Sequence, residues 1–189
     1  MSQRYKIRLE DRWRVSAAGS DRVTLELRFL PFVEGARISH LLGQELARRE
    51  FSHCGGATWE KRIGEHLLSI DAEFATATLS GEFSHIVDAS AEVEGTLDEC
   101  GDTRELAEAQ LREQLEDQLE HAVREEESQK RRELGADLQR ELSRLEPELN
   151  RIVDAVTIDA LKEKAAQLGT IESIDEDRDS GSISLVIEL

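Results

Sequence analysis

The chain has 189 residues, 39% hydrophobic and 34% charged, so it is long and apolar enough to bury a core of its own. A net charge of −17 argues against direct binding to nucleic acid or to anionic membranes, because like charges repel. It has no apolar run of about 18 residues, no secretory start and no disulfide framework in its two cysteines, so we expect a cytoplasmic protein.

The first 30 residues alternate between apolar and polar side chains. In YKIRLEDRWRVSA one parity is apolar, and the other carries Lys6, Arg8, Arg12 and Arg14; RVTLELRFL alternates in the same way. A period of two predicts strands, and the intervening AGSD predicts a turn, so we expect an N-terminal hairpin with one basic face. That face either neutralises the acidic remainder of the chain or docks an acidic partner.

The next 70 residues combine one helical segment with further strand patterns. GARISHLLGQELARREF places its apolar residues at helical intervals and predicts a one-sided helix. SHCGGATWEKRIGEH contains three glycines and predicts an irregular loop. From His66 to Leu97 the period of two returns, interrupted at Ser80 and Gly81, which predicts a long hairpin or a three-stranded antiparallel meander with one wet face.

The segment from Thr103 to Leu168 is acidic and helical, with two leucine stripes either side of REEESQKRRE. This polar centre has no apolar residue to bury, so we expect it to project, either as the tip of a helical hairpin or as part of one long helix. Ser143 and Glu146 form a capping box before Pro147, which predicts a new or kinked helix there, and Gly169 predicts its end.

The expected fold class is α+β. An antiparallel β-sheet, built from an N-terminal hairpin, a central meander and a C-terminal hairpin, packs with helices and carries a projecting acidic helical hairpin or long helix. Residues 1–102 are expected to form the β-rich core and residues 103–146 the charged helical arm. Residues 147–189 are expected to add a helix and a hairpin that complete the core, giving a single domain with an insertion.

The acidic turn IDEDRDSG is a weak cation candidate through Asp175, Asp177 and Asp179. A calcium loop of the helix–loop–helix type requires Gly at position 6 and Glu at position 12, and neither residue falls at its position when Asp175 is counted first. The polar residues and Gly181 suit a turn between two strands. We therefore predict a hairpin here, and no other metal or cofactor site.

Cys54, next to His53 and two glycines, is the candidate for a catalytic nucleophile. A thiolate requires a lowered pKa and a nearby base, and the glycine N–H groups could stabilise an oxyanion. Adjacent side chains usually diverge, however, and two glycines after a helix are ordinary in loops. The five histidines and two cysteines are scattered without ligand spacing, which disfavours zinc.

The pattern favours a non-enzymatic binding or assembly protein, an adaptor or accessory subunit that acts through the helical arm or the basic hairpin. Its partner is expected to be a protein, with a second copy pairing through coiled-coil helices as one option. One alternative is an enzyme or small-ligand domain around Cys54, and another is an acidic mimic of nucleic acid. The basic residues expected to contact a partner are Arg8, Arg12, Arg14, Arg124, Lys130, Arg131 and Arg132.

Overall fold

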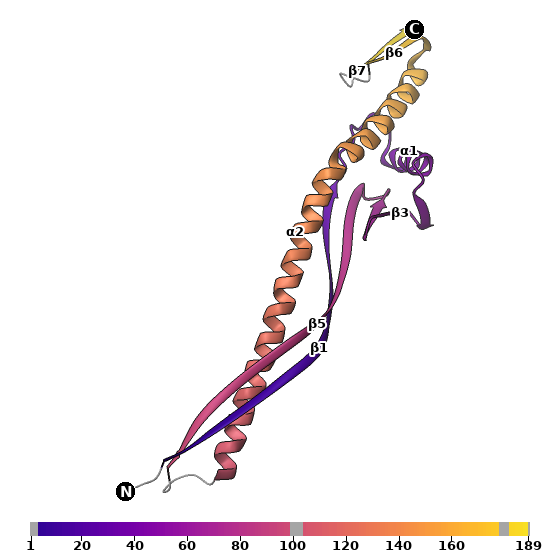
Figure 1. Ribbon diagram of the computed structural model, residues 1–189. Coiled ribbons are helices and arrows are strands. Elements are labelled where there is room, and N and C mark those ends of the chain that lie inside the picture. The colour runs from indigo at the N-terminus through magenta and orange to yellow at the C-terminus, as the bar shows by residue number, and fades with distance from the viewer. Residues whose placement is uncertain (1–3, 99–103, 178–181, 189) are drawn as a thin grey trace. The chain divides into compact units, whose positions relative to one another are not determined.

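The computed structural model describes residues 4–98, 104–177 and 182–188 (Figure 1). Within these ranges it contains a five-stranded antiparallel sheet, a two-stranded sheet and two helices, which confirms the α+β class. In chain order the elements are β1 (Arg4–Glu26), α1 (Gly35–Arg48), β2 (Ser52–Gly55), β3 (Thr58–Ile63), β4 (His66–Asp71), β5 (Thr76–Asp98), α2 (Arg104–Leu168), β6 (Thr170–Asp177) and β7 (Ser182–Glu188).

The larger sheet has the strand order β1-β5-β4-β3-β2. From His66 onward the structure has a long hairpin of β4 and β5, without the expected break at Ser80 and Gly81, and β2 and β3 extend it into an antiparallel meander. We expected the C-terminal hairpin to complete this sheet, but β6 and β7 form a separate two-stranded sheet among the described residues. Alternating Ile and Val predict that a strand forms, but they do not specify the strand with which it pairs.

The predicted N-terminal hairpin is wrong, because β1 is one continuous strand of 23 residues. Its neighbour β5 is also 23 residues long, so hydrogen-bonding partners continue past the AGSD segment. Gly19 does not mark a turn. A Cβ at this position would lie 2.7 Å from the ring of Phe83 on β5, so glycine is needed there for close approach.

The glycine-rich segment after α1 is also more regular than predicted. It forms β2 and β3, joined by a tight turn, with a β-bulge between His53 and Gly55. Gly55 and Gly56 have φ values of 112° and 60°, a region that glycine adopts with little strain. The glycines therefore make a hairpin rather than an irregular loop.

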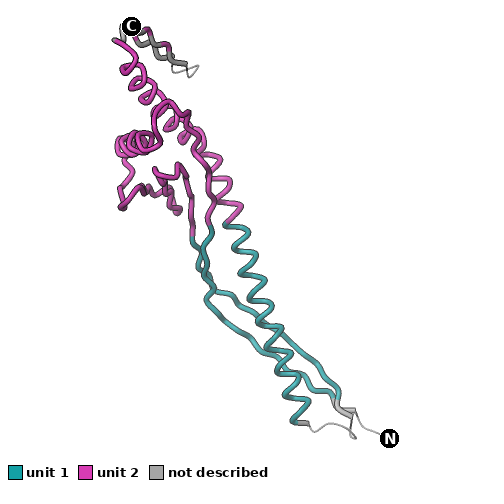
Figure 2. The backbone as a smooth tube through the Cα atoms, turned by 180° about the vertical axis from the view of Figure 1, so that it is seen from behind, with its two compact units in different colours: residues 1–21, 82–134 teal, residues 22–81, 135–189 magenta. Residues whose placement is uncertain are grey.

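The described residues divide into two compact units (Figure 2). Unit 1 comprises residues 1–21 and 82–134, and in it β1 and β5 run alongside the first half of α2 (Figure 1). Apolar side chains that recur every three or four residues along α2 meet the inward parity of the two strands. The buried core of unit 1 is Ala17, Val87, Ala89, Val93, Leu111, Leu115 and Leu119.

Unit 2 comprises residues 22–81 and 135–189. The helix predicted after residue 35 is confirmed as α1, and its apolar face is buried as expected. Arg37 and Arg48 of α1 form ion pairs with Glu163 and Asp159 of α2, so these two helices contact each other. Other buried apolar residues of unit 2 are Leu68, Ile70, Ala77, Leu79, Leu138, Leu142, Leu149, Ile152 and Val156.

Of the two alternatives left open for residues 103–145, the structure has the single helix. α2 runs without a break for 65 residues and contains Pro147 in its interior, so no new helix starts there. It ends at Leu168, and the N–H of Gly169 donates to the carbonyl of Ala165, at the predicted position. Within the described residues, neither helix has a stretch that is both long and apolar enough to cross a lipid bilayer.

Candidate functional site

Cys54 lies on β2, at the edge of the sheet, and its side chain is exposed. Its Sγ donates a hydrogen bond to Oε2 of Glu60 at 3.2 Å. This hydrogen bond, with smaller contributions from burial and from the carboxylate charge, raises the pKa of the Cys54 thiol. A raised pKa favours the neutral thiol, which opposes a role as a nucleophile.

His53 is fixed away from that thiol. Its Nε2 lies 3.0 Å from the carbonyl oxygen of Gly56; because a carbonyl can only accept, Nε2 carries the proton and donates. The His53 ring also packs beside Trp59, with ring centroids 4.9 Å apart. Successive side chains of a strand point to opposite faces, so His53 and Cys54 are separated as a catalytic pair.

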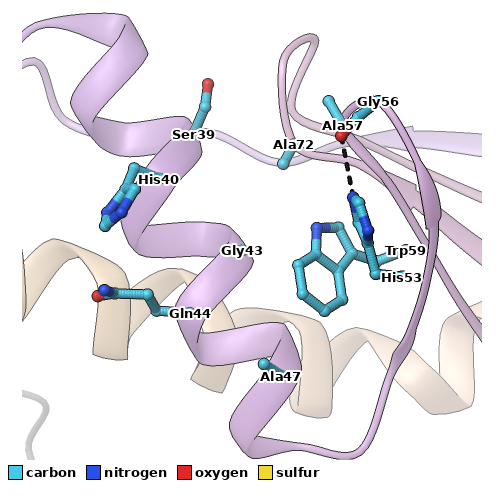
Figure 3. Close-up of a pocket in the computed structure, with 10 residues that line it drawn as sticks. All are labelled: Ser39, His40, Gly43, Gln44, Ala47, His53, Gly56, Ala57, Trp59 and Ala72. Atoms are coloured by element: carbon cyan, nitrogen blue, oxygen red, sulfur yellow. Dashed lines mark hydrogen bonds between the residues drawn. The ribbon is translucent and has the colours of Figure 1, made fainter.

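A groove of about 440 Å³ lies between α1 and the β2–β3 hairpin (Figure 3). Trp59 forms one wall and sits over Gly43 of α1, where a Cβ would lie 3.4 Å from the indole. Ala47 and His53 also line the groove. An aromatic wall opposite small helix residues can hold an apolar side chain or a small planar ligand. The sequence did not reveal this groove. Within its own segment Gly43 is only a glycine that a helix tolerates, and nothing in the sequence pairs it with Trp59.

The described residues of the acidic segment near the C-terminus belong to the predicted pair of strands. Asp175 and Asp177 belong to β6, where they pair with Ser184 and Ser182 of β7. Asp179 lies outside the described residues. Within the part of the chain that the structure describes, no three His, Cys, Asp or Glu side chains group closely enough to hold a metal ion.

The three arginines predicted on the basic face of β1 are exposed, as the alternation required. Arg8 pairs with Glu92, and Arg14 lies 4.0 Å from Asp88, so both are paired with acids on β5. The backbone N–H of Arg12 donates to Asp11 at 2.7 Å, but its guanidinium forms no ion pair with a described residue. Of the three, Arg12 has the side chain with most capacity to bind a partner's carboxylate.

The basic residues in the polar centre of α2 also differ in whether they form an ion pair. Arg124 pairs with Glu120 at 2.7 Å, and Lys130 pairs with Glu133 at 2.8 Å. The latter contact raises the pKa of Lys130 and lowers that of Glu133. The exposed Arg131 and Arg132 form no ion pair within the described ranges, although Arg132 donates to the backbone carbonyl of Ser128.

The inner side of this polar centre meets a half-buried histidine of β5, a contact that the sequence pattern did not predict. His85 of β5 lies 3.7 Å from Glu126, and its ring packs 5.9 Å from that of Phe83. Neither ring nitrogen of His85 hydrogen-bonds to a described residue. The polar centre therefore packs one face against β5, contrary to the expectation that it projects. The sequence spacing could have indicated this face, because Glu126 continues the helical stripe of Leu115, Leu119 and Ala122.

The fold and these sites define an α+β protein with exposed, charged surfaces on a long helix and on a long strand. A family model described as FtsH ternary system domain X5 matches residues 1–189. The chain therefore belongs to the FtsH ternary system domain X5 family. No curated protein and no solved structure matches it.

Proposed function

We propose that this chain is a non-enzymatic adaptor or accessory subunit that binds another protein component of an FtsH ternary system. The observation that carries the proposal is the match of the whole chain, residues 1–189, to a family described as a domain of that system. A ternary system has more than one component, so a member domain works beside other proteins. Binding to a partner is the function that agrees with this description and with the exposed charges of unit 1.

The contact residues we propose are three arginines, Arg12 of β1 with Arg131 and Arg132 of α2. All three are exposed and belong to unit 1, and none forms an ion pair with a described residue. Arg8, Arg14, Arg124 and Lys130 remain in the proposed surface, but each is paired with an acid of its own chain. Unpaired guanidinium groups favour an acidic patch on the partner, because arginine binds carboxylates in a bidentate manner.

A second candidate is binding of a small ligand in the groove beside Trp59. Its support is the groove of about 440 Å³, within the usual range for ligand sites. The version of this candidate that uses Cys54 as a nucleophile is weakened by the hydrogen bond to Glu60 and the raised pKa of the thiol. We therefore place the groove second, without a catalytic role for Cys54.

Size-exclusion chromatography with light scattering tests the leading proposal. The chain is mixed with the purified FtsH component of the system, and we expect a complex whose mass is the sum of the two. The variant R144E is a suitable control, because Arg144 is exposed, is paired with Glu141 and lies outside the proposed surface, so it should still form the complex. Separate elution of the two wild-type proteins would count against the proposal, as would a homo-oligomer that excludes the partner.

A further inference from the structure

The turn between β4 and β5, residues 72–75, presents the most exposed large apolar side chain of the described residues. Phe74 in this turn is 73% exposed. The four other phenylalanines of the chain are buried or half-buried, as an aromatic side chain usually is. An exposed phenylalanine in a protein with only 4% aromatic residues therefore requires an explanation.

Four hydrogen bonds fix this turn. Oδ1 of Asp71 accepts the backbone N–H groups of Glu73 at 2.9 Å and Phe74 at 3.0 Å. The carbonyl of Ala75 accepts the N–H of Leu27 at 2.7 Å, and the N–H of Ala72 donates to Ala57 at 2.9 Å. Phe74 is thus held on a rigid support, not on a loose loop.

The backbone at Ala75 carries strain. Its φ of 52° lies in the left-handed region, which residues with a Cβ avoid. Such a conformation persists only where the surroundings enforce it, and strained positions of this kind cluster at binding and switch sites. The hydrogen bonds of the turn offset this strain and keep the chain in the conformation that exposes Phe74.

We propose that Phe74 is the anchor by which this chain docks into an apolar pocket on the FtsH component of the system. This inference rests on the proposed function, from which it takes the partner. Aromatic anchors on preorganised supports dominate protein interfaces, because little conformational entropy is lost when they bind. Leu30, 57% exposed and three residues beyond Leu27, adds apolar surface on the segment that is bonded to the turn. The exposed Glu73 favours a basic rim around the pocket.

Calorimetric titration of the purified FtsH component with F74S tests the anchor. We expect binding on the order of 30-fold weaker than wild type, because removal of a central aromatic anchor has an effect of that size. F74L should keep part of the affinity. L168S is the matched control, since Leu168 is also exposed and lies in unit 2, and its affinity should equal that of wild type. F74S should melt within about 2 °C of wild type, because the side chain is exposed.

Two further variants test the rigid support. D71A leaves Phe74 in place but removes the acceptor of two N–H groups, so binding should weaken by about 5- to 10-fold. D71N keeps an oxygen that can accept both bonds, and its affinity should stay close to that of wild type. Equal weakening by D71A and D71N would overturn the role of the clamp.

The outcomes separate this inference from the proposed function. If wild type binds and F74S binds equally well, the anchor is wrong and the adaptor function stands. If wild type does not bind the FtsH component at all, the proposed function fails, and the anchor fails with it. Loss of self-association in F74S, seen by light scattering, would show instead that Phe74 docks onto a second copy of this chain.

Discussion

At the scale of single residues, the environment of Cys54 shows why a motif must be weighed with its neighbours in space. A Cys beside a His and two glycines resembles a nucleophile with its base, but the structure gives the thiol an acidic neighbour. Glu60 lies across the β2–β3 hairpin from Cys54, and its carboxylate stabilises the protonated form. Sequence spacing could not show this contact, because it depends on the pairing of β2 with β3, in which Glu60 lies opposite Ser52.

The first prediction concerns the reactivity of this thiol. The folded-state pKa of Cys54 is raised, so less thiolate is present at a given alkaline pH than in an unfolded chain. Glu60→Ala removes the largest cause and should increase the alkylation rate of Cys54 by iodoacetamide at pH 8. The measurement uses a Cys100→Ser background, with Glu65→Ala as a control acid that should leave the rate unchanged. A rate insensitive to Glu60 would refute the effect of this contact.

At the scale of elements, β1 depends on a glycine where the sequence suggested a turn. Gly19→Ala should lower the free energy of unfolding by about 1–3 kcal/mol, because its Cβ would collide with Phe83 in a packed layer. Gly35→Ala is the matched control: no atom lies within 4 Å of its Cβ, so its change should stay within about 0.5 kcal/mol. Equal effects of the two variants in urea unfolding would indicate that residues 17–20 form an exposed turn.

The continuity of α2 leads to a second prediction at this scale. A proline inside a helix removes a backbone hydrogen bond and clashes with the preceding turn. Pro147→Ala should therefore raise the free energy of unfolding by about 1–3 kcal/mol and increase the helical circular dichroism signal. Pro31→Ala is the control, because Pro31 lies in the loop before α1. No stabilisation by Pro147→Ala would support a helix that begins at this proline, as the sequence suggested.

Periodicity predicted most of the elements but not their partners. The alternation in β1 and β5 and the spacing of the leucines in α2 depend on local burial, so they could be recognised in one sequence. The continuous β1, the separate β6–β7 sheet and the groove beside Trp59 depend on contacts between distant segments. Glycine was the most ambiguous residue: Gly19 permits close packing, whereas Gly55 and Gly56 form a turn.

At the scale of the whole molecule, the strong negative charge bears on the choice of contact residues. Acidic residues outnumber Lys and Arg by 41 to 24, so an exposed cation has many acids of its own chain with which to pair. Arg12, Arg131 and Arg132 are exposed without such a pair among the described residues, and so they are the side chains we propose for a partner's acidic patch. Composition argued against nucleic acid and the patterning of the chain favoured a protein partner, but the family match supplies the system.

The most direct test of partner binding is a calorimetric titration of the purified FtsH component with wild type and with the triple variant R12E/R131E/R132E. We predict that wild type binds and that the triple variant binds about tenfold or more weakly, with a smaller dependence on salt, because complementary charges across the interface are reversed. Equal affinity and equal salt dependence for the two proteins, or no heat of binding with wild type, would contradict the account.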